Sequence, residues 1–95
     1  MSDEQRQVDE QLASRCFANQ EYEKASELYE KLYQKYNQPY LFHQYVECLI
    51  LQKNYDEAIH QLKLFERKYP KDAKTLVDLV FVYGLNDEPK KAEKQ

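Results

Sequence analysis

Between residues 21 and 36 the apolar positions recur every three or four residues, which is the period of an α-helix. Polar residues occupy the positions between them, so the segment has one apolar and one polar face. A second stripe of the same kind covers residues 55–69. The pattern predicts two amphipathic helices. Their apolar stripes consist of Tyr22, Ala25, Leu28, Tyr29, Leu32, Tyr33 and Tyr36, and of Tyr55, Ala58, Ile59, Leu62, Phe65 and Tyr69.

Three further segments continue the helical pattern. Residues 40–51 are apolar around most of the helix and follow Pro39, a residue well suited to a first helical position. Residues 73–85 repeat this pattern, with Asp72 as the expected N-cap. Residues 3–18 form an earlier and more polar helix, whose apolar row is Val8, Leu12 and Cys16.

The breaks between these helices are short, which predicts antiparallel hairpins without a linker or a second domain. Asn54 and Glu57 have the spacing of a capping box at one helix start. A further helix is expected to begin near Pro89, after a break at residues 86–87. The prediction is therefore an all-α chain of about five helices plus a partial sixth.

Composition narrows the class of protein. The 95 residues are 42% apolar and 33% charged and include a single glycine, which argues against a turn-rich all-β fold. Fourteen basic and 17 acidic residues leave a net charge of −3, so a nucleic-acid partner is not expected. No stretch has the length and apolarity of a membrane helix, and the charged N-terminus does not resemble a signal peptide. Cytoplasmic localisation is the default expectation, although a trimmed form of an exported or periplasmic protein would have the same features.

The residues that could carry chemistry do not form a catalytic or metal-binding pattern. His43 and Glu47 have i,i+4 spacing, but two ligands without a third do not predict a metal site. A phosphate-binding loop needs several glycines, and Gly84 is the only one in the chain. Cys16 and Cys48 fit no metal or redox motif and are expected to be apolar core residues. We expect no enzymatic activity, no cofactor and no metal.

An internal repeat gives the strongest signal. Residues 20–25 match residues 53–58 at a shift of 33, and residues 87–92 continue the match at a further shift of 34. The chain therefore resembles the tetratricopeptide-repeat family, whose helix pairs recur about every 34 residues. The positions that carry the resemblance are Leu12, Ala13, Cys16, Ala25 and Tyr29 in the first repeat, Phe42, Tyr45, Val46, Leu49, Ala58, Leu62 and Pro70 in the second, and Leu76, Leu79, Val80, Tyr83 and Ala92 in the third.

The resemblance implies one domain over residues 1–95, built as a right-handed stack of helix hairpins, a TPR-like α-solenoid. It implies two full repeats, residues 1–37 and 38–71, and the start of a third, residues 72–95. Family members bind a peptide or a partner helix in a concave groove, so the function implied is a non-catalytic protein–protein interaction module. The groove positions carried over are Glu10, Ser14 and Phe17, then Tyr40, His43, Glu47 and Ile50, then Lys74, Val77 and Phe81.

Other interpretations stay open at this point. Phe17, Ile50 and Phe81 could simply pack between helices. The family's carboxylate-clamp subgroup is excluded, because Glu10 and Asp78 stand where an anionic tail needs other side chains. Alternative functions are a structural or assembly segment of a longer repeat array, or a helical accessory region of an enzyme whose catalytic domain lies elsewhere. The apolar last helix also predicts self-association as a homodimer, or continuation into further repeats, through Val77, Val80, Phe81 and Tyr83.

Overall fold

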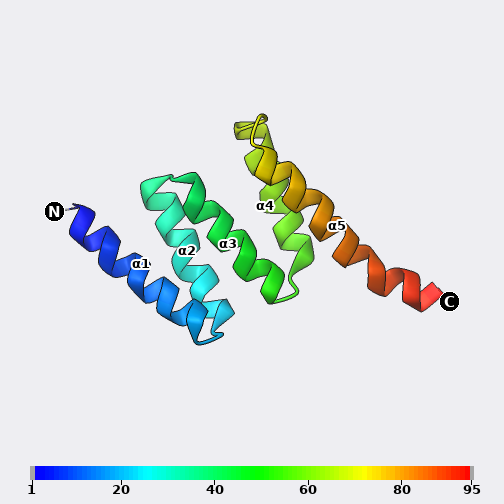
Figure 1. The fold of residues 1–95 in the computed structure, drawn as a ribbon, viewed down its shortest axis with the longest axis horizontal. Coiled ribbons are helices and arrows are strands. Elements are labelled where there is room, and N and C mark those ends of the chain that lie inside the picture. The colour runs from blue at the N-terminus through cyan, green and yellow to red at the C-terminus, as the bar shows by residue number, and fades with distance from the viewer. Residues whose placement is uncertain (1, 95) are drawn as a thin grey trace. The chain divides into compact units, whose positions relative to one another are not determined.

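A computed structural model of the chain describes the backbone of residues 2–94 and the side chains of residues 4–86. Its helices are α1 (Ser2–Ala18), α2 (Tyr22–Tyr36), α3 (Pro39–Leu51), α4 (Tyr55–Lys68) and α5 (Ala73–Lys94) (Figure 1). No strand occurs within residues 2–94. The predicted all-α class is confirmed.

The helices form two compact units, Met1–Gln52 and Lys53–Gln95. In the first unit, α2 packs against both α1 and α3. In the second unit, α4 packs against α5. Helices that follow one another within a unit run in opposite directions (Figure 1), as the short connections predict.

Three helix starts were predicted from particular residues, and the structure confirms two of them. Pro39 occupies the first turn of α3, as expected. Asp72 caps α5, because its carboxylate accepts hydrogen bonds from the Lys74 backbone N–H and the Thr75 hydroxyl, both at 3.1 Å. The capping box predicted at Asn54 is wrong: the Asn54 side chain makes no cap bond, and the Glu57 carboxylate instead accepts a bond from Gln61.

The repeat register predicts most of the core. Ala25 and Ala58, two of the positions that carry the repeat, are both fully buried. Buried residues at predicted packing positions in the first unit are Ala13, Cys16, Ala25, Tyr29, Phe42, Tyr45, Val46 and Leu49, and in the second unit Ala58, Leu62 and Leu79. The expectation that Cys16 and Cys48 are buried and free is also confirmed.

Several predicted packing positions are exposed instead. On α1 the row expected to pack is buried only at Cys16, since Val8 and Leu12 lie on the outer side of the helix. On α5 the predicted packing residues Leu76, Val80 and Tyr83 are exposed as well. The buried residues of this helix are Thr75, Leu79 and Val82, which lie on one side of it. Because α5 packs against α4 on that side, the opposite side of α5 stays bare.

The break expected at residues 86–87 does not occur, and the separate sixth helix near Pro89 is wrong, because α5 continues without interruption to Lys94. The real breaks after α1, α2 and α3 each contain a residue with positive φ, namely Gln20, Asn37 and Lys53. No residue of α5 has positive φ, so the backbone there lacks the reversal that ends α1, α2 and α3. The predicted packing residue Ala92 lies outside the described side chains.

Candidate functional site

Of the residues predicted to bind a partner, Glu10 and Ser14 lie on α1, and Tyr40, His43 and Glu47 lie on α3. We call these five residues the α1–α3 face. Two of them are in direct contact, since the Tyr40 hydroxyl donates a hydrogen bond to Glu10 Oε2 at 3.0 Å. Arg6 completes the cluster. Its Nε donates to Glu10 Oε2 at 3.1 Å, and its Nη2 donates to the Tyr40 hydroxyl at 2.5 Å. These bonds join the exposed edges of α1 and α3.

The Arg6 guanidinium also lies close to two aromatic rings. Its Cζ is 5.5 Å from the centre of the Tyr36 ring and 5.6 Å from that of Tyr40, within the range of cation–π attraction. Hydrogen bonds to Tyr40 and then to Glu10 raise the pKa of Arg6 above its ordinary value. The charge of Glu10 is therefore balanced within the face, whereas Glu47 remains an exposed carboxylate.

Tyr29 of α2 forms the floor between the two helices. Its ring is buried, and burial is the main reason that the pKa of its hydroxyl is raised. Cys48 and Glu10 raise this pKa further, while a hydrogen bond with Ser14 lowers it. The hydroxyl thus lies near side chains of both α1 and α3.

The α1–α3 face shows no catalytic arrangement. His43 is half-buried and forms an edge-to-face contact with Phe42, with 5.5 Å between ring centres. The Cys48 thiol is enclosed, and burial followed by the neighbouring Glu47 raises its pKa to about 12, so it stays protonated at neutral pH. Among the described residues, no three His, Cys, Asp or Glu side chains are grouped so that they could hold a metal ion.

The remaining predicted binding residues lie in the second unit. Lys74, Val77 and Phe81 are all exposed on α5. Lys74 Nζ lies 3.6 Å from an Asp78 carboxylate oxygen. The predicted self-association residues Val77, Val80, Phe81 and Tyr83 are exposed on the same helix. A single groove that combines these residues with the α1–α3 face remains a prediction.

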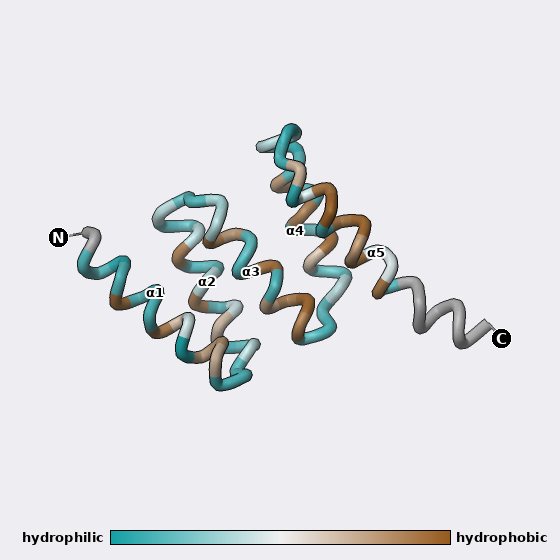
Figure 2. The backbone as a smooth tube through the Cα atoms, viewed as in Figure 1, coloured by the Kyte–Doolittle hydropathy of each residue, from teal (hydrophilic) through white to brown (hydrophobic). Residues whose placement is uncertain are grey.

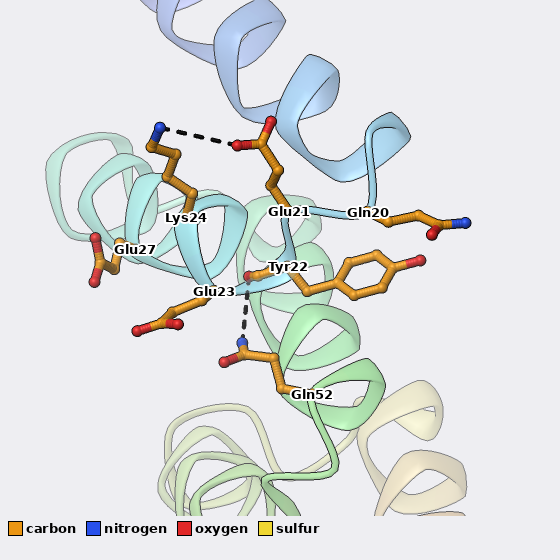
Figure 3. A pocket seen from close by; sticks show the side chains of 7 residues that line it. All are labelled: Gln20, Glu21, Tyr22, Glu23, Lys24, Glu27 and Gln52. Carbon is orange, nitrogen blue, oxygen red and sulfur yellow. Dashed lines mark hydrogen bonds and ion pairs between the residues drawn. The ribbon is translucent and has the colours of Figure 1, made fainter.

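An open depression of about 700 Å³ lies at the turn between α1 and α2 (Figure 3). Its lining residues are Gln20, Glu21, Tyr22, Glu23, Lys24, Glu27 and Gln52. Lys24 Nζ lies 3.9 Å from Glu21 Oε2, and Gln52 Nε2 donates a hydrogen bond to the Tyr22 carbonyl oxygen at 3.2 Å. In Figure 3 the carboxylates of Glu21, Glu23 and Glu27 point in different directions. The depression therefore lacks the converging groups that a catalytic site needs.

Sequence reasoning missed Arg6, Tyr29 and Tyr36 as parts of the α1–α3 face. Arg6 and Glu10 have i,i+4 spacing, so their ion pair could have been found from the sequence. The hydrogen bond between Arg6 and Tyr40 joins residues 34 positions apart, so no short-range pattern in the sequence indicates it. The sequence pattern places Tyr29 and Tyr36 on the apolar stripe of their helix, but it does not indicate that they lie beside the α1–α3 face.

In the described part of the chain, no helix is both long enough and apolar enough to cross a membrane. A family model described as tetratricopeptide repeat matches residues 17–76, which is more than half of the chain. Neither the curated proteins nor the solved structures contain a match to the chain.

Proposed function

Because the chain belongs to the tetratricopeptide-repeat family, whose repeats generally mediate protein–protein interaction, we propose that it is a non-catalytic module that binds a peptide or a partner helix on its α1–α3 face. The observation that carries this proposal is the cluster of Arg6, Glu10 and Tyr40 over the buried Tyr29. The cluster holds an aromatic ring and polar groups in fixed positions at the surface. Such anchors are typical of peptide-binding surfaces.

The charges of the face suggest the kind of peptide. Arg6 already pairs with Glu10, so Glu10 is not available as a strong anchor for a basic side chain. Glu47 is exposed, and Tyr40 presents part of its ring to solvent. We expect the preferred peptides to place a Lys or Arg near Glu47 and an apolar or aromatic side chain near Tyr40.

Selection from a random-peptide phage library, followed by titration of the best synthetic peptide, tests the proposal. Amide chemical shifts should change on α1 and α3, around Ser14, Tyr40 and His43. Shift changes confined to the other side, around Lys31 and Lys35, would contradict it. The variant Glu47→Arg should weaken the peptide by about tenfold or more, because it reverses the charge of the anchor.

Glu27→Arg provides the matched comparison, since Glu27 is an exposed glutamate that lines the depression at the α1–α2 turn. This variant should leave the affinity unchanged. If Glu27→Arg weakens the peptide and Glu47→Arg does not, the binding site is the depression and the proposed face is wrong.

A second candidate function, as an assembly segment, is favoured by a different observation. The exposed side of α5 carries large apolar residues that the second unit does not cover.

A further inference from the structure

The side of α5 that faces away from α4 is a continuous apolar surface, which we call the bare face of α5. It consists of Leu76, Val77, Val80, Phe81, Tyr83 and Gly84. Leu76 and Gly84 are each four positions from Val80, Val77 and Tyr83 are each three positions from it, and Phe81 is four from Val77, so the six residues share one side of the helix. Val80 is 74% exposed and Val77 is 65% exposed. Figure 2 shows the apolar character of α5 along the part of the helix that contains these residues.

The internal repeat shows that this surface is of a kind that is normally covered. Val80 occupies the repeat position of Ala13 in α1 and of Val46 in α3, which are 0% and 1% exposed. Tyr83 likewise corresponds to Cys16 and Leu49, which are both buried. In the first unit, α2 packs against the helix that carries Ala13 and Cys16. The bare face of α5 therefore has the residues of a helix-packing surface without a helix packed on it.

Gly84 gives an independent indication of what covers the bare face. A glycine inside a helix is less favourable than alanine, and Gly84 has no positive φ that would require it. A Cβ atom added there would meet nothing within 4 Å, so the second unit does not need the small residue either. The missing side chain of Gly84 leaves a recess beside Val80. A second helix could approach α5 closely at this recess, which would explain why a glycine stands there.

We propose that the bare face of α5 binds the same face of a second copy of this chain, with the two α5 helices antiparallel and crossing at Val80. In this arrangement Leu76 of each copy lies opposite the recess at Gly84 of the other. None of the residues that make up the bare face is charged. Lys63 of α4 borders the face, with its Nζ 5.6 Å from the centre of the Tyr83 ring, and at this edge its ammonium can stay in water.

The size of the face suits a reversible dimer. The exposed apolar side chains amount to roughly 500 Å² on each copy, which is a large patch for a monomer. Two copies together would then bury about 1,000 Å², which is below the range for stable specific interfaces and in the range of weak, transient ones. We therefore expect a concentration-dependent equilibrium between monomer and dimer.

Sedimentation velocity of the full chain from about 1 μM to about 1 mM measures this equilibrium. We expect the sedimentation coefficient to rise from the monomer to the dimer value. The variant Val80→Asp should weaken the dimer at least about tenfold, whereas Val8→Asp, at a valine that is 59% exposed on α1, should not. A monomer at every concentration overturns the proposal, as does a dimer that both variants weaken equally. Circular dichroism of both variants checks that the helices are retained.

Cysteine cross-linking tests the antiparallel pairing, because the native thiols are buried and should not react. Val80→Cys should form a disulfide-linked dimer by itself under mild oxidation. Leu76→Cys alone should not, but a mixture of Leu76→Cys and Gly84→Cys chains should. Cross-linking of Leu76→Cys to itself as efficiently as Val80→Cys would overturn the antiparallel arrangement. None of these substitutions alters the α1–α3 face, so peptide binding there succeeds or fails independently.

Discussion

The Cys48 thiol lies in an enclosed site where it cannot be solvated as a thiolate. Burial raises its pKa from the ordinary 9.0 to about 12. In the unfolded chain the thiol regains water and ionises near its ordinary value. Above about pH 9, unfolding therefore releases a proton that the folded chain retains.

We predict that the free energy of unfolding falls as the pH rises through this window. For one thiol, the free energy of unfolding falls by at most about 1.4 kcal/mol per pH unit. Urea unfolding between about pH 8 and pH 9.5, below the pH at which half of the tyrosines are ionised, measures this slope. The Cys48→Ala variant should be less stable overall, because it loses buried volume, but it should lose most of this pH dependence. The raised pKa of Tyr29 contributes in the same direction in both proteins. An equal slope in both proteins would show that Cys48 is not the group responsible.

Residues also differ in how far the sequence alone predicts their roles. The burial of Cys48, Ala25 and Ala58 follows from their positions on apolar stripes. The contact between Arg6 and Tyr40 does not, because it depends on how α1 and α3 lie against α2. A pattern along one helix identifies its faces, but it does not identify the side chain that meets each face.

At the scale of elements, the turns that end α1 and α3 share an unusual backbone. Gln20 has φ 65° and Lys53 has φ 64°, and the two are 33 residues apart, at equivalent repeat positions. A side chain with a Cβ atom is disfavoured in this left-handed region, where glycine is at ease. Both turns therefore store backbone strain in residues that are not glycine.

We predict that Lys53→Gly stabilises the chain by about 1 kcal/mol, because it relieves this strain. Thermal or urea unfolding at neutral pH measures the change. Lys71→Gly is the control, since Lys71 is an exposed turn lysine without positive φ. There a glycine only adds freedom to the unfolded chain, so the control should be neutral or slightly destabilising. A loss of stability in both variants would contradict the strain at Lys53.

The sequence prediction of the helices failed at residues 86–87, where no left-handed turn occurs. Asn86 and Asp87 were expected to end a helix because these residue types are common in turns. They sit instead within α5, where no residue has positive φ. Residue type thus indicates where a helix is able to end but does not decide whether it ends, and α4 ends before Tyr69 without a positive φ.

For the whole molecule, the repeat period predicted the all-α class, the order of the helices and most of the buried positions. It did not predict that Leu76, Val80 and Tyr83 are exposed, because a repeat pattern assumes that the neighbouring helix is present. The residues predicted to bind a partner lie in two separate units. For these residues, repeat position predicted exposure at the surface, but it did not predict the bonds among Arg6, Glu10 and Tyr40.

The packing of α1 on α2, α2 on α3 and α4 on α5 joins only helices that are consecutive in the chain. Each pair can therefore form by closing a short loop, which costs little chain entropy. Folding rates rise as contacts become more local, and helical proteins with such contacts fold within microseconds to milliseconds. Temperature-jump relaxation followed by tyrosine fluorescence should show refolding on this timescale. Refolding over seconds would point to a step outside these neighbouring pairs.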